Sequence, residues 1–281
     1  MKVSIITVTY NSEKYLADCI SSVRKQTYSN IEHIIVDGKS TDRTIQIIQR
    51  NSKHIARWIS ETDRGMYDAI NKGIRMATGD IIGVLNSDDM LASANVIMDI
   101  VACFEETNTD TLYGDLVYVD PGDTQKVVRY WKGLTYKRSR FRYGWMPAHP
   151  TFYIRRELFD KFGEYENHYY TAADYEFMAR YLYTNRVSSY YLPKMIVKMR
   201  NGGLSNGSIY RRLRANRRDY LAMKRNKIPF AFFVSILKPL IKIPQYKRSR
   251  GQQTYGPEKA HPYFDTTVLF FPSDKKTEAE S

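Results

Sequence analysis

Two adjacent carboxylates, Asp88 and Asp89, end the mainly apolar segment GDIIGVLNSDDML, residues 79–91. The segment begins like a buried strand and ends in two negative charges. An aspartate in such a place either caps a following helix or binds a cation. Magnesium and manganese ions prefer one or two carboxylates combined with phosphate oxygens. The pair therefore predicts a helix cap or a divalent-metal site.

Polar residues also follow two other predicted strands. Residues 3–9 are a short β-branched run that leads into Tyr10 and Asn11, and residues 31–37 end at Asp37. Ligands of open parallel sheets gather at the carboxyl ends of the strands, so we expect these residues and Asp88 to share one rim. Asp37 by itself is equally typical of a turn. As a set, the residues predict a binding site.

The elements that must position these residues alternate in type along the first hundred residues. Apolar runs with strand character are each followed by a segment with apolar residues at helical spacing. Four such units predict a parallel sheet with right-handed crossovers and helices on both faces. The strands are expected at 3–9, 31–37, 56–60 and within 79–89, with helices within 15–23, 41–50, 66–77 and 93–106.

The pattern changes after about residue 110. Residues 112–119 and 127–133 have strand character and are joined by the turn sequence DPGD, which predicts an antiparallel or mixed extension of the sheet. Residues 151–154 and 189–199 then flank a helix within 173–183.

Composition excludes several classes of protein. Cys19 and Cys103 are the two cysteines of the 281 residues, and each lies in a segment of helical periodicity, so we expect buried thiols in a reducing cytoplasm. The first ten residues read as a strand, not as a signal peptide. GxGxxG does not follow the first strand and GxxxxGK[ST] is absent, which removes the main support for a dinucleotide oxidoreductase or a P-loop protein.

Four ordered blocks resemble the successive motifs of a family 2 glycosyltransferase with the GT-A fold. The blocks are VTYN (8–11), VDGKSTDRT (36–44), ETDRGMYDAINKGIRMATGDIIGVLNSDD (61–89) and TAADYEF (171–177). Within them, DRGMYDAINKGI resembles the colanic-acid-type branch of bacterial polysaccharide transferases. The resemblance covers residues 1–205 and implies an α/β fold with a Rossmann-like, mostly parallel sheet.

The resemblance also implies a nucleotide-sugar donor site. By position, residues 9–11 at the end of the first strand would line the nucleotide. Asp37, which ends the second strand, would hydrogen-bond its base. Mn²⁺ or Mg²⁺ would bind Asp88, with Asp89 beside it. Asn86 stands where the family has the first acid of D-x-D-D, and its amide can bond a ribose hydroxyl. The other donor residues implied are Thr9, Tyr10, Asn11, Asp37 and Arg64. Asp68 and Asn71 either support the same wall or lie on a solvated helix face.

Asp174 matches the position of the family's general base. Removing a proton from an acceptor hydroxyl requires such a carboxylate, and a single displacement inverts the anomeric configuration. By itself Asp174 is equally typical of a first helical turn. A glycoside hydrolase also uses two carboxylates, but it has no need of a nucleotide rim. His149, between two prolines, either contacts the acceptor or forms a structural hydrogen bond.

A glycine-containing loop, MRNGGLSN (199–206), resembles the segment that relatives close over the donor diphosphate. Arg200 and Ser205 are its groups able to bind phosphate oxygens. The loop ends the catalytic domain that we expect at residues 1–205, with a nucleotide-binding half (1–110) and an acceptor half (111–205). A basic extension (206–250) and a tail (251–281) follow.

Most of the net charge of +13 lies near the C-terminus, because residues 205–250 hold thirteen Lys or Arg and one acid, Asp219. Residues 228–244 are too short and too interrupted to span a bilayer, so we expect an interfacial, membrane-associating segment with an inserted apolar face. That face is predicted to include Phe230, Phe232, Phe233, Ile236 and Leu237. The alternatives are a helix packed on the catalytic domain and a basic nucleic-acid-binding helix.

Together these features predict an inverting glycosyltransferase. It would move one sugar from a UDP-, GDP- or dTDP-sugar to a lipid-linked saccharide at the cytoplasmic face of a bacterial membrane, in surface-polysaccharide assembly. No nucleic-acid partner is expected. A non-catalytic nucleotide-sugar-binding protein and a nucleic-acid-binding protein are the other functions that the pattern allows.

Overall fold

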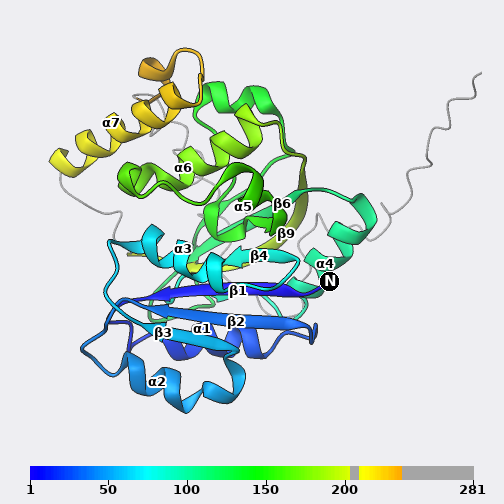
Figure 1. The fold of residues 1–281 in the computed structure, drawn as a ribbon, viewed down its shortest axis with the longest axis vertical. Coiled ribbons are helices and arrows are strands. Elements are labelled where there is room, and N and C mark those ends of the chain that lie inside the picture. Colours follow the sequence, from blue (N-terminus) through cyan, green and yellow to red (C-terminus); the bar gives the residue numbers. More distant parts are fainter. Residues whose placement is uncertain (203–208, 236–281) are drawn as a thin grey trace, which may run out of the picture.

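A computed structural model describes residues 1–202 and 209–235. Within these residues one nine-stranded mixed sheet runs through the molecule in the order β3-β2-β1-β4-β8-β6-β9-β5, with β7 paired to β6. Helices cover both faces, as Figure 1 shows: α1 and α2 lie on one side of the β1–β3 strands and α3 lies on the other. The predicted α/β class with helices on both faces is confirmed.

The first half has the predicted alternation of strands and helices. β1, β2, β3 and β4 are mutually parallel where they pair, so Thr9 at the end of β1 lies beside Asp37 at the end of β2. The strands are β1 (Val3–Thr9), β2 (Ile31–Asp37), β3 (Arg57–Ser60) and β4 (Ile81–Val84). The helices are α1 (Leu16–Arg24), α2 (Thr44–Arg50), the 3-10 turn η1 (Ser52–His54) and α3 (Met66–Met76).

The second half supplies the antiparallel pairings that the strand–turn–strand segment predicted. β8 pairs antiparallel with both β4 and β6, while β9 runs parallel to β6. The strands are β5 (Met90–Leu91), β6 (Thr111–Val119), β7 (Val127–Trp131), β8 (Tyr153–Arg155) and β9 (Ser189–Arg200). The helices are α4 (Val96–Thr107), η2 (Arg138–Tyr143), η3 (His149–Thr151), α5 (Glu157–Phe162), η4 (Asn167–Ala172), α6 (Ala173–Met178), η5 (Ala179–Thr184) and α7 (Ile209–Arg225).

The two halves are joined where β4 pairs with β8, with Gly83 opposite Tyr153. The absence of a side chain at Gly83 makes room for the aromatic ring, since an added Cβ would lie 2.3 Å from a Tyr153 ring carbon. The chain leaving β4 leads to Asp88, and the chain entering β8 comes from His149. Because the two strands are antiparallel, both of these segments lie at the same edge of the sheet.

Alternate residues of the central strands face two apolar layers. Ile6 and Val8 pack with α3 and α6, whereas Val3 and Ile5 pack with Cys19 on α1 and with α4. Both cysteines are unpaired, as predicted; Cys19 is buried and Cys103 is half-buried. Burial raises the pKa of the Cys19 thiol to about 12, so it is an inert core residue.

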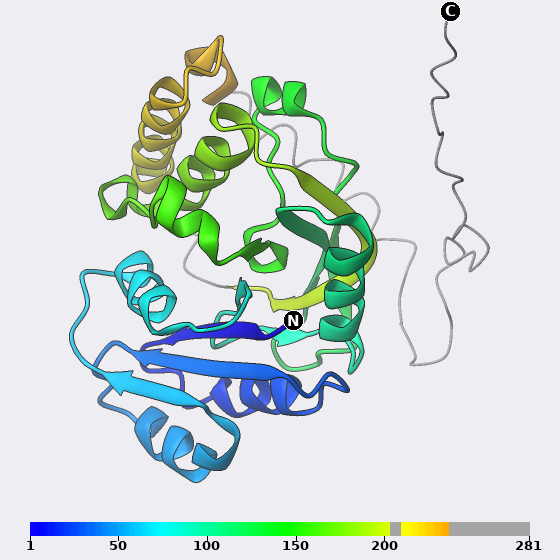
Figure 2. The ribbon, with the colours of Figure 1, turned by 45° about the vertical axis from the view of Figure 1, so that its right-hand side comes forward.

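The C-terminal helix α7 packs on the acceptor half, on the side away from β1–β3 (Figure 2). Ala222, Met223, Ile228 and Val234 belong to the same apolar cluster as the residues of α6. Phe230, Phe232 and Phe233 instead point outward, with 76%, 58% and 64% of their surface exposed. No helix among the described residues is long and apolar enough to cross a membrane. Ile236, Leu237 and the predicted tail lie outside the described residues.

The join between the halves gives a stability prediction. Gly83→Ala should lower the free energy of unfolding by about 1–3 kcal/mol, because the added methyl group overpacks the Tyr153 ring. Chemical denaturation measures this change. Gly122→Ala is the matched control, since its added Cβ would meet only Asp120 Oδ1 at 3.5 Å. Equal stability of the two variants would contradict the proposed close packing of β4 on β8.

Candidate active site

The loops after β1, β2 and β4 are tied together at one rim of the sheet. The Gly38 amide donates to the Thr9 carbonyl at 2.8 Å. The Asn11 side-chain oxygen accepts a hydrogen bond from the Thr41 amide at 2.9 Å. The backbone of Asn11 is left-handed, with a φ of 49°. The predicted residues at the ends of β1 and β2 are therefore brought together, with the Tyr10 side chain exposed beside them.

The loop after β4 joins the same rim. The hydroxyl groups of Ser12 and Ser87 are 2.8 Å apart, which places the residues before Asp88 against the loop after β1. The Thr9 hydroxyl is buried and has no hydrogen-bond partner among the described residues. A ligand at the rim would supply that partner.

Asp37 is fully buried and holds this rim together. Its carboxylate accepts hydrogen bonds from the Ser40 amide at 2.9 Å and from the Ser60 hydroxyl at 2.6 Å, and the Ser40 hydroxyl also donates to it. The sequence pattern did not single out Ser40 or Ser60. A base that bonds Asp37 must share the carboxylate with these two serines.

Asp88 and Asp89 differ in their surroundings. Asp89 is fully buried, and its Oδ2 accepts from the Asn86 side-chain amide at 2.9 Å. Asp89 Oδ1 and Asn86 Oδ1 are buried without a partner among the described residues. Burial, and then the charge of Asp88, raises the pKa of Asp89 well above its usual value. Burial also raises the pKa of Asp88, which the charge of Arg200 opposes.

The alternative interpretation of Asp89 as a helix cap is wrong. Asp89 is followed by β5, and the next helix, α4, begins only at Val96 after Asn95. The two carboxylates thus lie between two strands. There they gain no stabilisation from a helix N-terminus, and the charge of Arg200 offsets only part of the effect of burial on the pKa values of both carboxyls.

This oxygen-rich arrangement fits a hard divalent cation. Two carboxylates and an amide oxygen are the ligands that Mg²⁺ and Mn²⁺ prefer, and two of the oxygens lack partners. Within residues 1–202 and 209–235, no three His, Cys, Asp or Glu residues are grouped closely enough to hold a metal by themselves. The remaining ligands would therefore have to come from water or from a bound phosphate.

Arg200 lies beneath the pair at the end of β9. Its Nη1 donates to the Asp88 carbonyl at 2.8 Å, its Nη2 forms an ion pair with Asp18 at 2.5 Å, and its guanidinium lies 4.4 Å from the centre of the Tyr15 ring. The side chain is buried, and its Nε has no partner among the described residues. The expected phosphate ligand is thus already engaged in supporting the loop of Asp88. Ser205 lies outside the described residues.

Arg64 is exposed at the turn before α3. Its Nη2 lies 3.2 Å from Asp68 Oδ1, and its backbone amide donates to Asp68 Oδ2 at 3.0 Å. Asp68 is buried, as is Asn71, whose side chain exchanges two hydrogen bonds with the Tyr165 backbone at 2.8 and 3.0 Å. The alternative of a solvated helix face is wrong for both residues. Asp68 holds the turn that presents Arg64, and Asn71 ties α3 to the backbone of Tyr165.

Asp174 lies in the first turn of α6, and its Oδ1 accepts from the Tyr175 amide at 2.7 Å. Burial raises the pKa of Tyr67, and the charge of Asp174 raises it further. The charge of Asp174 also raises the pKa of His149, against the larger effect of burial. The carboxylate is therefore close to a buried polar cluster of the acceptor half. Tyr67, on α3, was not singled out by the sequence pattern.

His149 belongs to that cluster. Its Nε2 lies 2.9 Å from the Tyr165 hydroxyl, and its ring packs edge-on against Tyr165. Burial lowers the pKa of His149, so the imidazole is neutral near pH 7. These contacts match the structural hydrogen bond that the sequence left open as an alternative to acceptor contact.

Comparisons with known proteins identify the family of the chain and its fold. A family model described as Glycosyl transferase family 2 matches residues 4–163. A PGL/p-HBAD biosynthesis glycosyltransferase of Mycobacterium bovis is 29% identical over 208 residues, which are 72% of this chain and 78% of that protein.

Solved structures share the fold. TarS 1–349 of S. aureus in complex with UDP has a TM-score of 0.61 and 24% identity, over 84% of this chain and 66% of that chain. The mannosyltransferase PcManGT of Pyrobaculum calidifontis, in complex with GDP-Man and Mn²⁺, has a TM-score of 0.61 and 16% identity, over 89% of this chain and 74% of that chain. The family match covers more than half of the sequence, and with the shared GT-A fold it gives the identity of the chain: it is a glycosyltransferase of family 2.

Proposed function

We propose that the chain is a metal-dependent, inverting glycosyltransferase that moves one sugar from a nucleotide-diphospho-sugar to a hydroxyl of a lipid-linked saccharide. The observation that carries the proposal is the buried, unpartnered carboxylate oxygen of Asp89 beside Asp88, at the rim shared by β1, β2 and β4. A buried carboxylate is costly unless a cation or hydrogen bonds balance it. The rim favours a ligand that brings both a metal and a phosphate.

Asp88 would hold Mn²⁺ or Mg²⁺ directly, and Asp89 would add a second negative charge behind it. Such a metal supplies Lewis-acid stabilisation of the departing diphosphate. Arg200 fixes the loop of Asp88 by donating a hydrogen bond to the Asp88 carbonyl. The end of β1 and Asn86 would line the nucleoside. The donor class rests on the known neighbours, which bind UDP, UDP-GlcNAc and GDP-Man.

Asp174 would act as the general base on the acceptor side. A carboxylate at the start of α6 can accept the proton of an acceptor hydroxyl as the new glycosidic bond forms. One displacement without a covalent intermediate inverts the anomeric configuration. His149 and Tyr165, which are hydrogen-bonded to each other, would support this side of the site.

The acceptor would be reached at a membrane surface, on the cytoplasmic side. Phe230, Phe232 and Phe233 are exposed together, and Lys224 and Lys227 border the same shallow hollow. Aromatic side chains with cations beside them suit insertion among anionic lipid headgroups. We therefore propose peripheral attachment, with a role in the assembly of a surface polysaccharide.

The general base is tested with Asp174→Asn, which keeps the size of the side chain. We expect transfer to fall by about a hundredfold or more, because an amide cannot accept the proton, while nucleotide binding is unchanged. Release of UDP or GDP from a panel of UDP-, GDP- and dTDP-sugars measures transfer, and thermal shift with the free nucleotide measures binding. Full activity of the variant would remove Asp174 from this role.

The metal site is tested with Asp88→Asn. Mn²⁺ should raise the melting temperature of the parent protein by mass action and leave the variant unchanged. In chelator, the variant should be more stable than the parent at neutral pH, since the carboxyls have raised pKa values in the folded state. Carboxyls with raised pKa values bind protons more tightly in the folded state, so the free energy of unfolding of the parent falls as pH rises above about 4. The stability advantage of Asp88→Asn over the parent should therefore vanish near about pH 4.

Asp160→Asn is the control for this experiment, because Asp160 is an exposed acid on α5. An equal Mn²⁺ shift in the parent and in Asp88→Asn would contradict the metal site.

Membrane attachment is tested with the double substitution of Phe232 and Phe233 by serine. Flotation with anionic liposomes should fall at least about tenfold, because each exposed aromatic ring contributes more than 1 kcal/mol on insertion. Tyr143→Ser removes another exposed aromatic residue, distant in the sequence, and should float like the parent. Salt-sensitive binding to DNA without flotation would favour the nucleic-acid alternative instead.

A further inference from the structure

Glu176 lies two residues beyond Asp174 on α6 and is fully buried. Its charge is balanced by Arg180, one turn further along the same helical segment. Arg180 Nε lies 3.1 Å from Oε1 and 3.2 Å from Oε2 of Glu176, and its Nη2 lies 3.1 Å from Oε2. Breaking such a buried pair leaves an uncompensated charge, so this contact strongly favours one position of the helix.

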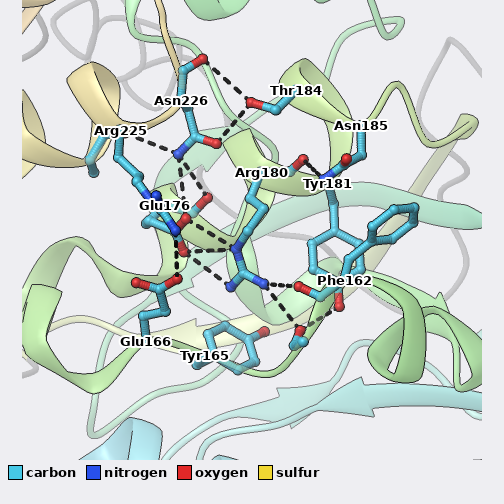
Figure 3. A network of polar contacts seen from close by, with 12 residues as sticks. Phe162, Tyr165, Glu166, Glu176, Arg180, Tyr181, Thr184, Asn185, Arg225 and Asn226 are labelled. Atoms are coloured by element: carbon cyan, nitrogen blue, oxygen red, sulfur yellow. Dashed lines mark hydrogen bonds and ion pairs between the residues drawn. The ribbon is translucent and has the colours of Figure 1, made fainter.

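The same guanidinium also holds the turn that follows α5. Arg180 Nη2 donates to the Glu164 carbonyl at 2.7 Å, and Nη1 donates to the carbonyls of Phe162 and Gly163. The next residue is Tyr165, the hydrogen-bond partner of His149. Figure 3 shows Arg180 between Glu176 and the turn at Phe162. One side chain therefore connects the helix of Asp174 to the turn that leads into Tyr165.

Asn226 reaches this network from the end of α7. It is 3% exposed. Its Nδ2 donates to the Ala222 carbonyl at 3.0 Å and also lies 3.4 Å from Glu176 Oε1 and 3.5 Å from the Glu176 carbonyl oxygen. Its Oδ1 accepts from the Thr184 hydroxyl at 2.9 Å (Figure 3). The amide thus joins the two ends of the segment 176–184 to the C-terminal extension.

We propose that Asn226 is a positioning residue for Asp174. By contacting Glu176 and accepting from Thr184, it holds the helical segment 176–184 against the end of α7, and Arg180 in turn joins that segment to the turn before Tyr165. The packed part of the C-terminal extension is therefore part of the acceptor site, in addition to any role at a membrane. This inference rests on the proposed role of Asp174 as general base. It assigns Asn226 an effect on proton transfer and not on donor binding.

The test is Asn226→Leu in the full chain, a substitution of similar size that removes the side-chain hydrogen bonds with Thr184 and Ala222 and the two polar contacts with Glu176. We expect kcat to fall about tenfold or more and the donor KM to stay unchanged, because a small displacement of a base slows the chemical step. Release of UDP from UDP-GlcNAc or of GDP from GDP-Man, whichever is turned over, measures both constants. Thermal shift with UDP or GDP checks that the donor half is intact.

Asn185→Leu is the matched control. Asn185 is exposed at the end of the same helical segment. Its side chain donates to the main-chain carbonyl of Arg180 and, among the described residues, bonds neither the Arg180 guanidinium nor Glu176, so its loss should leave kcat near that of the parent. Thr184→Val, at an exposed residue, is a second and milder variant for the case that Asn226→Leu does not fold. It should also lower kcat, by a smaller factor, and leave the donor KM unchanged.

A kcat for Asn226→Leu, or for Thr184→Val in its place, that equals the Asn185→Leu value would overturn the inference. So would a rise in donor KM without a change in kcat. An active Asp174→Asn variant would instead refute the base assignment, so the two failures are distinguishable.

Discussion

The antiparallel pairing of β4 with β8 is the constraint on which the site depends. It is the direct pairing between the parallel strands of the first half and the mixed strands of the second. With Gly83 opposite Tyr153, the segment after β4 and the segment before β8 leave the sheet at one edge. The first carries Asp88 and the second carries His149. A shift of this register would separate the proposed donor and acceptor sides.

Glu176 and Asp89, two of the fully buried carboxylates among the described residues, differ in how their charge is balanced. Glu176 is matched by Arg180 and Asn226, so its charge stabilises one arrangement of the acceptor half. Asp89 receives one amide hydrogen bond from Asn86 and keeps an unpartnered oxygen next to Asp88. The first is satisfied within the protein and has a structural role. We propose that a bound cation stabilises the second, because a buried carboxylate without a full counter-charge raises the free energy of the folded protein.

Local patterns predicted the elements and the rim, because both depend on short stretches of sequence. Alternating strand and helix periodicity gives the parallel half, and parallel strands bring their polar ends together. The contacts that modify those roles join residues far apart in the chain. Asn71 and Tyr165 are separated by 94 positions and Asp18 and Arg200 by 182, so no local pattern reveals that Arg200 is already paired or that Asn71 is buried.

We propose that Asp174 assists a single displacement at the anomeric carbon of a nucleotide sugar. The most direct measurement is the anomeric configuration of the product, determined by NMR after transfer from an α-linked donor such as UDP-GlcNAc or GDP-Man. A single displacement gives a β-glycosidic product and no α-linked product. Retention of the α configuration would contradict it, because retention requires a mechanism in which Asp174 is not the base of a single displacement.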